Sequence, residues 1–515
     1  MTPHRSARSA GLKVNDSFMR YRSWPPAPVT GIVFIVAVVL GLCGCTVGPD
    51  FHAPAAPDTD HYVAGAPIQT VGTSTGGGQS QTLVAGQDIP AQWWNLFHSA
   101  PLDALVRTAL HDSPTIAAAQ AALRSAQEGY VAQRGSSVYP QLDGQFQATR
   151  QASPAAAFGL PQLGTSTFTL FDAAVNVSYK FDLWGGTRRQ LEALAAQSDY
   201  QRWQLEAARL TLAGNVVTTA ITAAALNDQV AATTDILATE RDQLAIIQRQ
   251  HAAGAASQTD VLTQQAQVAQ LEATLPGLQK SVAQAGHRLA VLSGQTPDHA
   301  STAGLSLAAL TLPAQLPMSL PAKLVRQRPD VLAAQSQLHQ ASAQAGVATA
   351  NLYPQLTLSG SIGSETTSIG DLFSAGTAAW NIGGSLMQPL FHGGELRAKR
   401  RQAFDNLDQA TAQYRGTVLS ALQDVADSLR ALQADALTLQ ADRRAEAAAH
   451  DSLEITRRQF QAGGTSYVNL LIAQRQDAQA RLMRIQGEMA RLTDSAALLQ
   501  SLGGGWWNRD TDGSR

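Results

Sequence analysis

The side chains that could carry chemistry are few, and the most reactive of them lie at one end of the chain. The only two cysteines, Cys43 and Cys45, lie near the N-terminus, so no thiolate metal site or internal disulfide can form elsewhere. The eleven histidines are scattered and do not pair at the spacing of metal ligands. The sequence has no HExxH motif, no CxxC motif and no phosphate-binding loop. We therefore expect no enzyme, no metal and no cofactor, and we look for the chemistry of a modified cysteine.

Residues 1–44 have the features of a secretory signal. Basic residues precede an apolar run at 31–42, which is too short to span about 30 Å of hydrocarbon. The run ends in LCGC, which resembles a bacterial lipobox and implies cleavage before Cys45, with S-diacylglycerol and N-palmitoyl groups on that residue. Thr46 replaces the aspartate that retains lipoproteins in the inner membrane, which favours the outer membrane. The alternative is an ordinary signal with chance cysteines.

Composition and charge narrow the class of protein further. Without the five basic residues and one acid of residues 1–45, the formal net charge changes from −2 to −6, so we expect no nucleic-acid partner. Residues 45–90 are rich in Pro, Gly, Ser and Thr, which predicts a lipidated surface tether, not part of a core.

The remaining chain is an internal duplication, with copies at 91–300 and 301–505 and a short tail at 506–515. The copies match in order at 138–142 and 352–356, at 182–186 and 390–394, and at 253–257 and 462–466. Three colinear matches at nearly constant offset predict two copies of one structural unit.

Each copy begins with residues that alternate in polarity. In the first, Leu142 and Phe146 alternate with Asp143 and Gln147, as expected of a strand with one apolar and one polar face. The pattern predicts strands at about 140–149, 168–183, 354–362 and 378–388. Strands of about ten residues cross a bilayer when tilted, although a half-buried soluble sheet would show the same alternation.

Long helices follow each Gly-Gly pair. Residues 187–252 and 395–461 lack proline, and 66 residues of helix extend about 100 Å. A coiled-coil seam recurs in steps of three and four at Tyr414, Val418, Leu422, Val425, Leu429 and Leu432. The helices predicted at about 258–294 and 467–502 would return beside them. The fold class is therefore mixed α+β, a membrane protein with an internal twofold repeat.

Four strands cannot close a barrel, and open sheet edges in lipid are prohibitively costly. The chain must therefore form oligomers, and three copies would supply twelve strands.

The chain resembles the outer-membrane factor family, in particular the efflux lipoproteins that serve resistance-nodulation-division pumps. The resemblance rests on CTVGPDF at 45–51, WWNLF at 93–97, LVRQRPDV at 324–331, YPQL at 353–356 and LGGGW at 502–506. It implies a homotrimer anchored in outer-membrane lipid, with a 12-stranded barrel continued by a long periplasmic helical barrel. It also implies a passive exit duct for small molecules such as drugs, opened by a periplasmic adaptor (membrane fusion) protein and energised by the inner-membrane pump.

The resemblance also assigns roles to the two hairpin turns. The tips, where the adaptor would dock, comprise Gly254, Ala255, Ala256, Gly463, Gly464 and Thr465. Glycine supplies the permissive backbone that a tight reversal needs, and small residues allow close approach. A plain turn without a partner is the alternative.

The periplasmic gate would lie just past the tips, at Asp260, Val468, Asn469 and Ile472. Relatives often carry aspartates at the positions of Asn469 and Ile472, whereas Asp260 matches a family aspartate that helps to hold the closed state. We therefore predict a gate sealed more by apolar side chains than by an acidic ring.

Two other classes of protein remain open from the sequence. A structural coiled-coil lipoprotein without a pore would lack the four alternating strands. A duct that exports proteins with a type I system would keep the channel, although the lipobox and tether favour efflux.

Overall fold

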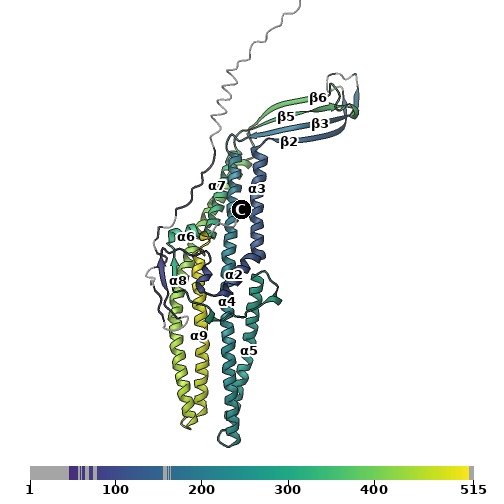
Figure 1. The fold of residues 1–515 in the computed structure, drawn as a ribbon. Helices are drawn as coiled ribbons and strands as arrows, with labels where there is room; N and C mark the ends of the chain where they lie inside the picture. The colour runs from purple at the N-terminus through teal and green to yellow at the C-terminus, as the bar shows by residue number, and fades with distance from the viewer. Residues whose placement is uncertain are drawn as a thin grey trace, which may run out of the picture. The chain divides into compact units, whose positions relative to one another are not determined.

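The computed structural model describes residues 46–55, 58, 59, 61–63, 69–72, 78–154, 159, 162 and 164–509. The predicted signal peptide and Cys45 lie outside these residues. The first copy contains α2 (Ala100–Asp112), α3 (Pro114–Val138), β2 (Gln141–Pro154), β3 (Thr165–Phe181), α4 (Gly186–Ala252) and α5 (Gln258–Leu292). The second contains α6 (Pro321–Gln327), α7 (Pro329–Ala350), β5 (Gln355–Thr366), β6 (Ala378–Met387), α8 (Glu395–Gln461) and α9 (Tyr467–Ser501). The equivalent order of long helices and strands confirms the twofold repeat (Figure 1).

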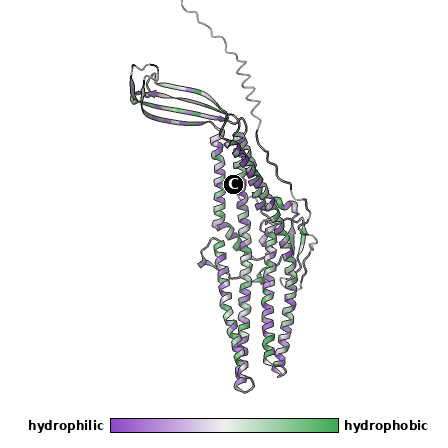
Figure 2. Ribbon diagram, turned by 180° about the vertical axis from the view of Figure 1, so that it is seen from behind, coloured by the Kyte–Doolittle hydropathy of each residue, from purple (hydrophilic) through white to green (hydrophobic). Residues whose placement is uncertain are grey.

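The four strands form one antiparallel sheet in the order β2-β3-β5-β6. The register sorts side chains by polarity: Val175 pairs with Ile362, which pairs with Trp380, whereas the next row holds Asn176, Ser361 and Asn381. Green and purple segments alternate along the strands in Figure 2. Around these rows one face of the sheet is apolar and the other is polar, while β2 and β6 leave open edges.

The two 67-residue helices α4 and α8 are the longest elements. Five of the six residues of the predicted α8 seam are buried, and the sixth, Leu422, packs against the same core, which confirms the seam. Helix α5 returns along α4, and α9 returns along α8 (Figure 1). Among the described helices, α4 alone is long and apolar enough to cross a membrane, but 61% of that stretch is buried in the protein. We therefore assign α4 to the helical core.

The predicted tether is wrong for part of its length. Strand β1 (Thr82–Ala85) pairs in parallel with β4 (Gln315–Met318). The buried Gln81 side chain donates to the Pro313 carbonyl at 3.1 Å and to Ser495 Oγ at 2.9 Å. Residues 46–51 also pack against the helices, because Phe51 stacks on His339 of α7 with ring centroids 4.3 Å apart. A composition rich in Gly, Ser and Pro predicted the lack of regular structure, but side-chain hydrogen bonds still fix this segment on the core.

The predicted C-terminal tail also begins with packed residues. Trp506 donates its indole N–H to the Gln327 carbonyl at 2.7 Å, and Asn508 donates to the Ile89 carbonyl at 2.8 Å. The second copy therefore includes a short helical turn (Trp506–Asn508) beyond its predicted end.

Candidate gate and docking tips

The first hairpin tip is a tight reversal between α4 and α5. Gly254 adopts φ +76°, and an added Cβ would meet open space, so the backbone conformation alone demands glycine. The Gly254 N–H donates to the His251 carbonyl at 2.9 Å, and the Ala255 N–H donates to the Gln250 carbonyl at 2.7 Å. Gly254 and Ala255 are exposed, whereas Ala256 packs against an apolar cluster and is only partly accessible.

The second tip repeats this backbone geometry. Gly463 has φ +74° and its N–H donates to the Phe460 carbonyl at 3.0 Å, while the Gly464 N–H donates to the Gln459 carbonyl at 2.8 Å. Gly463 and Gly464 are exposed. Thr465 is half-buried, and its hydroxyl accepts a hydrogen bond from Asn469 Nδ2 at 3.0 Å.

The predicted gate residues of α9 lie together on one exposed face. Val468 is 55% exposed and Ile472, one turn later, is 49% exposed, with Asn469 beside them. Tyr467 and Leu470 point to the opposite side, into the protein. At the two positions where relatives often carry aspartates, this chain has an amide, Asn469, and an apolar side chain, Ile472.

Asp260 has a local role at the start of α5. Its carboxylate accepts from the Ser257 N–H at 3.0 Å and from Ser257 Oγ at 2.7 Å, while Ser257 Oγ accepts from the Asp260 N–H. This reciprocal capping box satisfies the first free donors of α5. In the described part of the chain, no hydrogen bond joins Asp260 to Val468, Asn469 or Ile472.

A buried polar network joins the two hairpins, and our sequence reasoning missed it. Gln264 of α5 is fully buried and donates to the Glu240 carbonyl at 2.9 Å and to the Glu240 carboxylate at 2.6 Å. The Tyr467 hydroxyl donates to Gln264 Oε1 from α9. Burial raises the pKa of Glu240, against the lowering effect of the Gln264 hydrogen bond. Burial likewise raises the pKa of Tyr467, so its hydroxyl remains a donor.

Apolar and exposed polar contacts surround this network. Ile247, Val261, Leu453 and Leu470 form a cluster to which all four long helices contribute. On the surface, α9 reaches the first hairpin through Arg475, which donates to Gln267 Oε1 at 2.9 Å, and through Arg481, which lies 3.2 Å from an Asp235 carboxylate oxygen. The ends of the two hairpins are thus held together by buried and exposed contacts.

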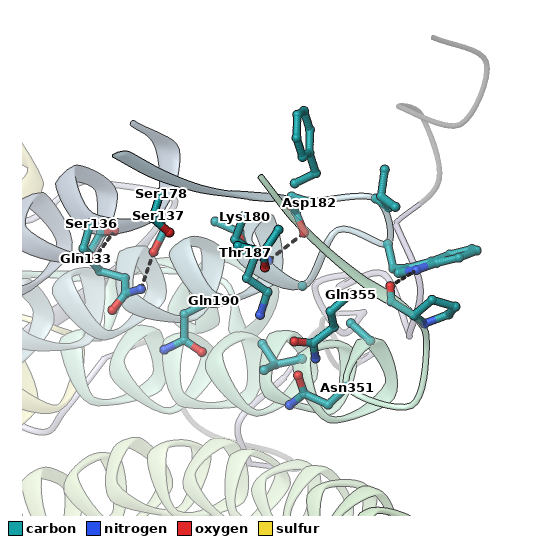
Figure 3. Close-up of a pocket in the computed structure, with 18 of the residues that line it drawn as sticks. Gln133, Ser136, Ser137, Ser178, Lys180, Asp182, Thr187, Gln190, Asn351 and Gln355 are labelled. Carbon is teal, nitrogen blue, oxygen red and sulfur yellow. Dashed lines mark hydrogen bonds between the residues drawn. The ribbon is translucent and has the colours of Figure 1, made fainter. Parts of the chain in front are cut away.

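A polar cavity lies at the opposite end of α4, where the sheet meets the helices. The cavity has a volume of about 510 Å³, and its lining includes Ser178 and Lys180 of β3, Gln133 and Gln190 of the helices, and Asn351 at the end of α7 (Figure 3). Asp182 caps α4 there by accepting the Thr187 N–H at 2.9 Å. The polar face of the sheet therefore continues onto polar helix surfaces, as a water-filled conduit requires.

We also looked for metal-ligand clusters among the described residues. No group of three or more His, Cys, Asp or Glu residues among them is arranged to hold a metal ion.

Comparison with known proteins places this geometry in a family. The sequence model described as outer membrane efflux protein matches residues 105–295 and 320–504. The chain is 31% identical over 476 residues to the pyoverdine export outer membrane protein OpmQ of Pseudomonas aeruginosa, covering 91% of this chain and 95% of that protein. It is 28% identical to the antibiotic efflux pump outer membrane protein ArpC of Pseudomonas putida, covering 92% and 95%. The structure of the outer-membrane channel OprN superposes with a TM-score of 0.80 at 26% identity, covering 90% of this chain and all of that one.

Proposed function

The chain belongs to the outer membrane efflux protein family, and we propose that it is an exit duct whose two hairpin tips receive a periplasmic adaptor. It is an outer-membrane channel subunit of a tripartite efflux system, not an enzyme. The observation that carries the proposal is the joining of an amphipathic sheet to two helical hairpins that end in small, exposed tips.

The need for an oligomer follows from the open edges of the sheet. A four-stranded sheet with unpaired edges at β2 and β6 cannot stand in hydrocarbon, where every backbone polar group needs a partner. Three chains close a 12-stranded barrel in the outer membrane, with the apolar rows toward lipid and the polar rows toward the lumen. Twelve strands and twelve long helices in a trimer match the architecture that the family resemblance implies.

We propose that partner proteins supply the energy for transport and set its direction. The channel offers no nucleotide-binding loop, so a resistance-nodulation-division pump in the inner membrane would drive export. The adaptor would span between pump and tips. Similarity to proteins named for export of pyoverdine and antibiotics supports small molecules as the cargo.

Lipidation of Cys45 would fix the duct to the outer membrane. The segment that follows Cys45 is attached to the protein beside the sheet, because the Val47 N–H donates to the Trp184 carbonyl at 3.1 Å. We expect mass spectrometry of the N-terminal peptide to find Cys45 at the new N-terminus with a diacylglycerol and a fatty acyl group. An unmodified cysteine on an uncleaved chain would refute this assignment.

Photo-crosslinking at the tips tests adaptor docking. A photoreactive amino acid at Ala255 or at Gly464 should capture one periplasmic protein in intact cells, because both positions are exposed at the ends of the hairpins. Gly464 accepts a side chain, since its φ is not positive and an added Cβ comes no closer than 3.5 Å to another atom.

The matched control is Ala447, an exposed position on α8 about 21 Å along the helix from its end at Gln461. We expect trimers from all three variants but adaptor capture only at the tips. Equal capture at Ala447, or capture of a protein unrelated to adaptors, would contradict docking at the tips.

A further inference from the structure

The loop between β5 and β6, residues 367–377, folds back over the apolar face of the sheet. Ser364 lies on this face, because it follows Ile362 by two residues in the same strand. The Ser364 hydroxyl is buried, donates to the Leu372 carbonyl, and lies 2.6 Å from Thr377 Oγ1. The loop is thus pinned to the apolar face at the end of the sheet away from the helices (Figure 1).

The internal hydrogen bonds of the loop suit an environment with little water. Thr377 Oγ1 donates to the Ser374 carbonyl at 2.9 Å and lies 3.2 Å from the Leu372 carbonyl. The backbone N–H groups of Asp371 and Ser374 donate to the Ser368 and Asp371 carbonyls at 3.1 and 3.0 Å. Backbone polar groups that are satisfied within the loop lower the cost of placing it against hydrocarbon.

The outward side chains of the loop are large and apolar. Phe373 is 83% exposed and Ile369 is 62% exposed, next to a strand on which Trp380 is 74% exposed. Leu372, between them, is buried against the sheet. Two neighbouring large apolar side chains are unfavourable on a loop that is surrounded by water. Their exposure therefore indicates that this side of the loop contacts an apolar environment.

An apolar groove of about 730 Å³ lies between the loop and the sheet. Phe146, Val175 and Ile362 of three strands line it together with Phe373 of the loop. All three strand residues belong to the face that the register makes apolar. The groove is therefore continuous with the lipid-facing surface of the barrel.

We propose that residues 367–377 form an interfacial foot, which lies in the outer leaflet and receives a lipid acyl chain between Phe373 and the sheet. The exposed carboxylate of Asp371 limits the depth of the loop to the headgroup boundary, where aromatic side chains of membrane proteins concentrate. The inference rests on the outer-membrane location of the barrel and is independent of adaptor docking.

Depth-dependent fluorescence quenching tests the foot. The variant Phe373→Cys, labelled with a nitrobenzoxadiazole fluorophore, is reconstituted as a full trimer into phosphatidylcholine vesicles that carry doxyl-labelled acyl chains. We expect lipid quenching similar to that of a Trp380→Cys variant, and protection from aqueous iodide. The substitution removes a side chain that is largely exposed, so folding should be retained.

The matched control is Asn381→Cys, one residue from Trp380 but on the polar face of the same strand. Its label should be quenched by iodide and several-fold less by the doxyl lipid. The unsubstituted trimer reports any labelling of Cys45. Quenching of the Phe373→Cys label by iodide alone would overturn the proposal, as would protection from both quenchers, which would mean that a neighbouring subunit covers the loop.

Discussion

Replacing Gln264 with leucine should free the ends of the two hairpins from each other. The substitution leaves the buried Glu240 carboxylate without its amide donor and the Tyr467 hydroxyl without its acceptor. A buried polar group that loses its partner costs about 1–3 kcal/mol, and more when it is charged, so we expect a local loss of about 3 kcal/mol. Because 1.4 kcal/mol is a factor of ten, amide hydrogen exchange near the tips should accelerate by about 100-fold.

The pH dependence of this effect has a definite sign. Burial raises the pKa of Glu240, and the Gln264 hydrogen bond partly offsets this, so its removal raises that pKa further. A carboxyl whose pKa is raised in the folded state favours folding below its unfolded pKa and loses that contribution as pH rises through the folded value. The exchange ratio of variant to native protein should therefore be larger at alkaline than at mildly acidic pH.

The control is Gln267→Leu, the same change one turn along α5. Gln267 accepts a hydrogen bond from Arg475 on the surface, so its loss should cost at most about 1 kcal/mol and show little dependence on pH. If both variants exchange alike, the buried network does not hold the hairpins together.

Introducing an acid at the gate should make the channel strongly cation-selective. In Ile472→Asp, the trimer would place three carboxylates on the exposed face of α9 that we propose as the constriction. A charge about 8 Å from a permeating ion contributes about 2 kcal/mol at an effective dielectric constant of 20. Since 1.4 kcal/mol is a factor of ten, we expect the cation-to-anion permeability ratio to rise about 30-fold, measured from reversal potentials in planar bilayers under a KCl gradient.

The matched control is Thr263→Asp, which lies at the equivalent position of the first copy, three residues after Asp260 as Ile472 is three residues after Asn469. Its effect on selectivity should be smaller, because Thr263 is half-buried, whereas Ile472 lies on the exposed face of α9. An apolar gate would be disproved by the following result. The native channel is strongly cation-selective, Asp260→Ala abolishes this selectivity, and Ile472→Ala leaves it unchanged. We expect Asp260→Ala to weaken the helix cap by about 1 kcal/mol and leave selectivity nearly unchanged.

Periodicity in the sequence predicted most of the fold. The second long helix begins at Glu395 and ends at Gln461, as predicted, and the first begins one residue early at Gly186. Strand β2 runs to Pro154, five residues beyond its predicted end. Arg150 stands in the row set that is apolar earlier in the strand, so the alternation stops while backbone pairing with β3 continues. Alternation of apolar and polar residues indicates which face of a strand is apolar. Backbone hydrogen bonds do not require this pattern, so a strand can extend beyond the residues that alternate.

The sequence by itself determined the duplicated unit, the need for an oligomer and the position of both tips, because repeats, turn glycines and apolar spacing are local signals. Only the tertiary structure decided which polar residues act together. Tyr467 and Gln264 are 203 residues apart, and no local sequence pattern indicates that they form a hydrogen bond with each other. The structure also gave Asp260 a capping role and fixed Gln81 of the supposed tether on α9. Polar contacts between distant segments depend on how helices and strands pack, and packing leaves no short-range pattern to read.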